Sequence, residues 1–159
     1  MIKIQIPATS ANLGAGFDAL GLALTYYNYI EMEECDKIDI TAADGLDIPT
    51  DERNLIYISA KDLFAVCGKK LEGLKLIQTS NIPMARGLGS SSACIIAGLV
   101  GANKMLGDPL TKDDLVDLAA QIEGHPDNTA PALLGGIVTA VFDGRKAVSY
   151  THLRAHETK

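Results

Sequence analysis

The sequence predicts an α+β fold in which one sheet is covered by helices on a single side. Strand-like stretches gather in the first half of the 159 residues, and most helical stretches follow with little strand–helix alternation. A doubly wound sheet would require that alternation. A glycine- and serine-rich loop leads into a helix that is apolar on nearly all sides, and such a helix has to be buried. The composition, 47% hydrophobic, supports one domain with a real core.

Alternating apolar and polar residues predict the strands of the first half. Isoleucines alternate with polar residues over Ile2–Ile6, and we expect this strand to end at Pro7. After a glycine-bearing loop, a β-prone stretch covers Leu20–Glu33. The other elements predicted here are a strand at 37–42, a helix at 54–66 that stops at Gly68, and a strand at 74–79.

Capping and turn residues mark the elements of the second half. The apolar run after the glycine-rich loop predicts a helix over about 90–106, and Thr111 with Asp114 predicts a capped helix to about Ile122. The last predicted elements are a short helix at 129–134, a strand at 137–142 and a hairpin turn at Asp143–Gly144. The polar tail, Ser149–Lys159, has neither periodicity, so we expect a frayed or non-native end.

Charge and hydropathy exclude several partners. The net charge of −6 argues against nucleic-acid binding. No apolar run approaches the length of a membrane span, so no membrane partner is expected. The three cysteines are scattered without metal-binding spacing, which is typical of reduced thiols. We therefore expect a cytoplasmic protein.

A glycine- and serine-rich segment, called the phosphate loop below, is the strongest functional signal. Its members are Pro83, Met84, Ala85, Arg86, Gly87, Leu88, Gly89, Ser90, Ser91, Ser92 and Ala93. Glycines leave room for an anion, and the helix start offers unpaired N–H groups and a positive dipole end. The serines can cap the helix, touch phosphate oxygens or hold a metal ion. The loop therefore predicts a nucleotide held by its phosphates.

Spacing excludes three common phosphate-binding loops. A Walker A loop needs a lysine after its second glycine, and none follows Gly89. A dinucleotide-binding fingerprint needs a third glycine where this chain has Ser92. A protein-kinase loop joins two strands, whereas this loop opens a helix.

Three segments in order resemble those of a known superfamily. The phosphate loop resembles the phosphate-binding motif of the GHMP kinases, which include galactokinases, homoserine kinases, mevalonate kinases and phosphomevalonate kinases. Pro7–Asp18 resembles the N-terminal signature of the homoserine kinases, and Glu123–Ala132 resembles their third conserved segment. The resemblance covers Met1 to about Val148.

The resemblance implies a fold and an activity. It implies an N-terminal ATP-binding domain over residues 1–148, similar to ribosomal protein S5 domain 2, with a C-terminal ferredoxin-like domain missing from this chain and a tail at 149–159 unlike the family. It implies ATP- and Mg²⁺-dependent phosphorylation of the L-homoserine hydroxyl to O-phospho-L-homoserine, a step of threonine biosynthesis. A homodimer is implied for the full-length protein. Because homoserine kinases are about twice as long, we expect this chain alone to bind ATP poorly and to turn over weakly or not at all.

The resemblance also assigns catalytic and metal-binding roles. Ser91 and Glu123 match the family's Mg²⁺ ligands, and phosphoryl transfer needs a metal that offsets phosphate charge. The alternatives are helix capping for Ser90 and Ser92, and an ordinary surface residue at a helix end for Glu123.

Substrate contacts are assigned on the same basis. Asn12 and Asp18 are expected to contact homoserine, with Asp18 meeting its ammonium group, although both residue types also favour turns. His125 and Asn128 are expected to line the same pocket. Asp127 lies in the region where an aspartate is assigned as general base in sugar and mevalonate kinases. In this chain we expect Asp127 to have a structural or orienting role, because a loose transition state asks mainly for positioning.

Two other functions remain open from the sequence. One is another GHMP kinase that phosphorylates mevalonate or a sugar, against which the Asn12–Asp18 segment argues. The other is an inactive nucleotide-binding fragment. Replacing Glu123 discriminates between them, since only a kinase needs this residue for transfer.

Overall fold

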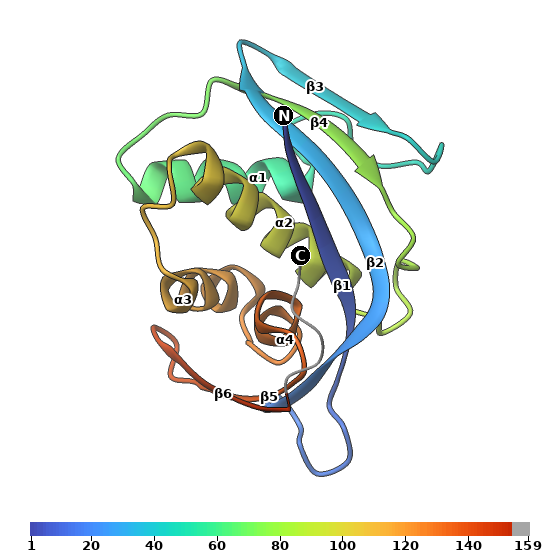
Figure 1. Cartoon of the computed structure of the whole chain (residues 1–159), viewed down its shortest axis with the longest axis vertical. Coiled ribbons are helices and arrows are strands. Elements are labelled where there is room, and N and C mark those ends of the chain that lie inside the picture. Colours follow the sequence, from blue (N-terminus) through green and yellow to red (C-terminus); the bar gives the residue numbers. More distant parts are fainter. Residues whose placement is uncertain (154–159) are drawn as a thin grey trace.

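The fold, in a computed structural model that describes residues 1–153 and the side-chain surroundings through residue 149, is one mixed sheet with helices on one side (Figure 1). The elements are β1 Ile2–Ala11, β2 Leu20–Cys35, β3 Ile38–Ala42, α1 Leu55–Val66, β4 Gly73–Thr79, α2 Ser90–Met105, α3 Lys112–Glu123, α4 Thr129–Leu134, β5 Ile137–Phe142 and β6 Ala147–Leu153. None of these helices is long and apolar enough to cross a membrane. The predicted α+β class is confirmed.

The long strand β2 organises the sheet. The strand order is β3-β4-β2-β5-β6, and β1 also pairs with β2. Residues 29–35 of β2 pair with β4, and residues 20–22 pair with β5. The β3–β4 pairing is parallel, whereas the other four are antiparallel. By spanning the sheet, β2 links the strand before the phosphate loop to the strand after α4.

The first strand continues past Pro7, so the predicted end there is wrong. β1 reaches Ala11 in antiparallel pairing with β2, and the register shifts between Pro7 and Thr9. Proline lacks a backbone donor and is accepted in a strand at such an irregularity. Thr9 consequently lies on a paired strand and not on a loop.

The predicted irregular tail is also wrong over its first residues. Residues 149–153 belong to β6, which forms an antiparallel hairpin with β5. Asp143 closes the turn by accepting the N–H groups of Arg145 and Lys146. The neighbouring strand supplies the hydrogen-bond ladder, so β6 forms without an alternating pattern of its own. Residues 154–159 lie outside the described part of the chain.

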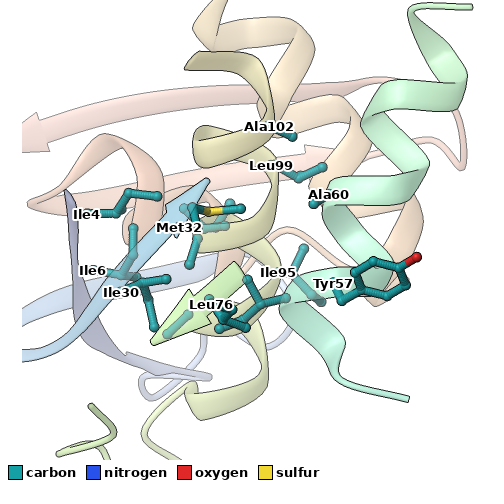
Figure 2. Packing of buried hydrophobic residues seen from close by; sticks show 14 of the residues in the cluster. Ile4, Ile6, Ile30, Met32, Tyr57, Ala60, Leu76, Ile95, Leu99 and Ala102 are labelled. Atoms are coloured by element: carbon teal, nitrogen blue, oxygen red, sulfur yellow. The ribbon is translucent and has the colours of Figure 1, made fainter. Parts of the chain in front are cut away.

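The core lies between the sheet and the helices α1 and α2 (Figure 2). From the sheet it receives Ile4, Ile6, Ile30, Met32 and Leu76; from the helices it receives Tyr57, Ala60, Ile95, Leu99 and Ala102. Small residues let α2 approach its neighbours, and a Cβ on Gly98 would collide with the Ile56 carbonyl of α1. The burial predicted for α2 is confirmed, and it holds the phosphate loop on a rigid support.

The predicted capping box at the start of α3 is confirmed. Thr111 Oγ1 accepts the Asp114 N–H at 3.2 Å, and Asp114 accepts the Thr111 N–H at 2.9 Å. Hydrogen bonds from the Thr111 side chain and backbone lower the pKa of the Asp114 carboxyl. The helix ends at Glu123, with Gly124 as its C-cap. The capped start therefore sets the position of Glu123 at the other end of the helix.

Asn54 caps α1, and we expect Asn54→Ala to lower the free energy of unfolding by about 2 kcal/mol. Its Oδ1 accepts the N–H groups of Ile56 and Tyr57, while its Nδ2 donates to the Pro49 carbonyl at 2.9 Å. Alanine leaves these buried groups unpaired. Urea denaturation measures the loss, and Asn54→Asp, which keeps the cap acceptor, should lose less. An alanine variant within about 0.5 kcal/mol of the wild type would contradict this role.

Candidate active site

The phosphate loop joins β4 to α2 and presents an uncapped helix start. Gly89 is the N-cap of α2 with a left-handed backbone, φ 65°, and among the described residues no side-chain hydrogen bond caps this end. The alternative that Ser90 and Ser92 serve as helix caps is therefore wrong. The first N–H groups of the helix stay available, which makes this end suited to an anion.

The two glycines of the loop have different surroundings. Gly87, at φ 69°, has open space where a Cβ would lie. A Cβ on Gly89 would instead collide with Thr9 Oγ1. The Thr9 N–H donates to the Leu88 carbonyl at 3.1 Å, so β1 holds the end of the loop. Gly89 is thus needed for close contact with β1, whereas Gly87 borders free space.

A cavity of about 650 Å³ lies against the phosphate loop, within the range of small-molecule sites. Its walls come from the phosphate loop, the end of β1, the segment that leads into α1, β4, the end of α3 and the residue before α4. The lining residues outside the loop are Ala11, Asn12, Ile48, Pro49, Arg53, Asn54, Leu55, Gln78, Cys94, Glu123 and Asn128. The cavity can hold a ligand that also touches the start of α2.

Glu123 is the last residue of α3, and its side chain reaches the start of α2. Its Oε1 accepts hydrogen bonds from Ser91 Oγ at 2.9 Å and Ser92 Oγ at 3.2 Å. The positive end of the α2 dipole therefore offsets the unfavourable place of a carboxylate at the end of α3. Of the part of the chain that is described, no residue hydrogen-bonds to Glu123 Oε2, so one oxygen remains for a ligand.

Asp127 joins three of the predicted site residues. It is 2% exposed and accepts from Asn12 Nδ2 at 3.1 Å and from Asn128 Nδ2 at 3.4 Å. The Nδ1 atom of His125 lies 2.6 Å from Asp127 Oδ1. These four residues, the Asp127 cluster, bring the segment directly after β1 and the α3–α4 connection together. A carboxylate with both oxygens engaged is suited to orienting its neighbours.

In the described part of the chain, Asp18 is connected to this cluster through Asn12. Its backbone N–H donates to Asn12 Oδ1 at 2.8 Å, and its side chain is exposed. Within residues 1–153 no hydrogen bond or ion pair to the Asp18 carboxylate is found. Asn12 and Asn128 line the cavity, whereas Asp18, His125 and Asp127 are not part of its wall.

Two arginines lie at the cavity, and they differ in their ion pairs. Arg53 is tied to Asp51, with Nη2 to Oδ2 at 2.8 Å. Arg86 on the phosphate loop is exposed and, within the described residues, has no ion pair. Burial, followed by the charge of Glu123, raises the pKa of the Cys94 thiol to about 11. The thiol is therefore neutral at pH 7, whereas Arg86 gives the phosphate loop a cation that is not paired with any described residue.

No group of three or more His, Cys, Asp or Glu residues forms a metal cage in the described part of the chain. Glu123 and Ser91 nevertheless provide a carboxylate and a hydroxyl oxygen side by side. Mg²⁺ commonly takes one or two protein oxygens and completes its shell with substrate phosphates and water. The donor chemistry of this pair therefore fits Mg²⁺ in the presence of a phosphate ligand.

Two residues of the site escaped the sequence analysis. Thr9 is fully buried and donates from Oγ1 to Asn128 Oδ1 at 2.8 Å. Gln78 is buried on β4 and lines the cavity. Gln78 had a usable signal, because a polar residue occupies the position where Leu74 and Leu76 set an inward apolar alternation. Thr9 had none, since its partners are distant in the sequence.

Residues 54–136, which include α1, the phosphate loop, α2 and α3, match the GHMP kinases N terminal domain. This chain belongs to the GHMP kinase family. The predicted family is confirmed, and the match covers more than half of this GHMP kinase chain.

Individual relatives show which kinases of the family this chain is similar to. A homoserine kinase from Carboxydothermus hydrogenoformans is 49% identical over 162 residues, which cover all of this chain and 53% of that protein. A solved structure described as a putative homoserine kinase from Listeria monocytogenes is 43% identical, with a TM-score of 0.84 over 95% of this chain and 53% of that one. A solved mevalonate kinase, at 18% identity and a TM-score of 0.73, shares the fold. This GHMP kinase chain therefore spans about half the length of the relatives it matches.

Proposed function

We propose that this chain is the ATP-binding part of a homoserine kinase, which transfers the γ-phosphoryl group of ATP to the side-chain hydroxyl of L-homoserine. The observation that carries the proposal is the uncapped start of α2, with Glu123 bonded to Ser91 beside it at the cavity. The high identity to homoserine kinases supports the choice of substrate.

ATP would lie with its triphosphate on the phosphate loop. The free N–H groups of the first turn of α2 bind phosphate oxygens, and the helix dipole favours the negative charge. Arg86 adds a cation that no described carboxylate neutralises. The buried α2 keeps these donors in place, so little ordering is required when the nucleotide binds.

Glu123 and Ser91 would hold Mg²⁺ through Glu123 Oε2 and Ser91 Oγ. A bound Mg²⁺ would offset the charge on the phosphate oxygens. Ser92 keeps its hydrogen bond to Glu123 Oε1 and thereby fixes the carboxylate.

The substrate would contact Asn12, Asp18, His125 and Asn128. Asp18 offers the homoserine ammonium group an exposed carboxylate that has no partner within residues 1–153. Asp127 orients Asn12 and Asn128, and each of its two oxygens lies in hydrogen-bond contact with at least one residue of the Asp127 cluster. Positioning of the hydroxyl beside the phosphate therefore supplies the catalysis, in agreement with a loose transition state.

Several further expectations from the sequence stay predictions. They are a role in threonine biosynthesis, a cytoplasmic location, a homodimer of the full-length protein, the domain boundary near residue 148 and a C-terminal ferredoxin-like domain outside this chain.

An ADP-release assay with a substrate panel tests the proposed function. The panel contains L-homoserine, mevalonate and galactose, with ATP and Mg²⁺. The assay uses the 159-residue chain and a chimera of its residues 1–148 with the C-terminal half of the Listeria monocytogenes relative. The chain alone should be nearly inactive, whereas the chimera should release ADP only with L-homoserine.

The same assay separates the alternatives. Turnover with mevalonate or galactose in place of L-homoserine would assign the chain to another GHMP kinase. Binding of ATP without turnover in the folded chimera would favour a non-catalytic nucleotide-binding fragment. Robust turnover by the chain alone would contradict the expected need for further residues.

A further inference from the structure

Gln78 places a polar amide at an inward position of β4. Leu74, Leu76 and Gln78 share the buried face of the strand, and Gln78 is 5% exposed. It lies between Ile30 of β2 and Ala42 of β3 in the sheet register. Burial of an amide on a face that otherwise carries leucine costs free energy unless its hydrogen bonds are made.

In the described part of the chain, the NH₂ group of the Gln78 amide has hydrogen-bond partners, whereas its carbonyl oxygen has none. Gln78 Nε2 donates to Ser80 Oγ at 2.7 Å and to Cys94 Sγ at 3.9 Å. Gln78 Oε1 is buried and has no hydrogen-bond partner, a condition shared within the described residues by Thr129 Oγ1. Gln78 lines the cavity and Thr129 does not. Buried acceptors are normally paired, so a cavity ligand is the natural source of the missing donor.

The rest of the cavity wall suits the base of a nucleotide. Where the phosphate loop holds the triphosphate, the base is left to the wall outside the loop. Ile48, Pro49 and Leu55 supply apolar surface there, and Gln78 supplies a polar group. A flat ring with a polar edge matches this combination, because ligand sites pair apolar walls with a few polar groups that fix orientation.

The unpaired Gln78 Oε1 determines which nucleotide bases can form a hydrogen bond at this place. A carbonyl oxygen accepts hydrogen bonds and cannot donate them. Adenine carries an amino donor at C6, whereas guanine and hypoxanthine carry a carbonyl acceptor there. We propose that Gln78 Oε1 accepts a hydrogen bond from the exocyclic amino group of adenine, which makes Gln78 the residue that selects ATP over 6-oxopurine nucleotides. This inference rests on the proposed function, since it requires a nucleotide in the cavity.

NMR titrations of the isotopically labelled chain with three nucleotides, each added up to millimolar concentration in the presence of Mg²⁺, test the inference. The probes are ATP, ITP, which has a carbonyl at C6, and purine riboside triphosphate, which has neither group. We expect ATP to bind at least about tenfold more tightly than ITP, with the unsubstituted purine between them. The three probes share ribose and triphosphate, so their ratios isolate the group at C6.

A variant then assigns the preference to Gln78. Gln78→Met keeps the length of the side chain and removes both polar atoms; it should weaken ATP binding about tenfold and bring the ATP-to-ITP ratio near one. Gln121→Met is the matched control on the exposed face of α3 and should keep the wild-type ratio. If Gln78→Met does not fold, the order of the three probes on the wild type still decides.

Each outcome is informative. Equal affinities for the three nucleotides would overturn the inference and leave ATP binding, and with it the proposed function, intact. A preference for ITP would overturn it as well, because it requires the amide to present its N–H groups to the base. The absence of binding by every nucleotide would overturn the inference, whereas the proposed function is decided separately by the ADP-release assay with the chimera.

Discussion

Replacing Glu123 with alanine is expected to lower kcat by roughly three orders of magnitude, since a bound metal contributes several kcal/mol to phosphoryl transfer. Glu123 is the carboxylate bonded to Ser91 and Ser92 at the start of α2. Without it, the phosphate loop keeps its N–H groups but loses the carboxylate proposed to bind Mg²⁺. ATP binding should therefore weaken far less than transfer.

The measurement uses the chimera with ATP, L-homoserine and Mg²⁺. Glu123→Gln serves as an isosteric second variant, because its amide oxygen can still accept from Ser91 while its charge is lost. Glu72→Gln is the control; Glu72 pairs with Lys70 before β4, away from the cavity. Wild-type kcat in Glu123→Ala would assign Glu123 to the surface of α3 and remove it from the metal site.

Local signals in the sequence were sufficient for elements that carry their own caps and turns. α4 and β5 have the bounds expected from the flanking glycines and the apolar run. Thr111 and Asp114 gave the start of α3, because a capping box is made within four residues. The phosphate loop was recognisable for the same reason: its glycines and serines act on the helix that follows directly.

Contacts between distant segments could not be predicted in this way. The hydrogen bond from Asn12 to Asp127 joins residues 115 positions apart, and the bond from Thr9 to Asn128 joins residues 119 apart. β1 beyond Pro7 and β6 are strands because β2 and β5 offer pairing partners, and neither has a strong alternation. The sequence therefore indicated candidate residues for the site, whereas the sheet determines which of them meet.

The relation between β1 and the phosphate loop leads to a second large effect. Gly89→Ala is expected to destabilise the protein by about 3 kcal/mol, from left-handed backbone strain and from overpacking against Thr9 Oγ1. Relief of the collision requires the loop to move away from β1, which displaces the first N–H groups of α2. ATP affinity should consequently fall at least about tenfold in the molecules that remain folded.

Gly68→Ala is the matched control for this prediction. Gly68 follows α1 at φ 67°, nearly the φ of Gly89, but has open space around the added Cβ. It should cost only the backbone strain, about 1–2 kcal/mol, and leave ATP affinity unchanged. Urea denaturation and NMR titration with ATP measure the two effects. The difference between the variants isolates the contact of the loop with Thr9, and equal stability losses with equal ATP affinities would show that β1 does not position the phosphate loop.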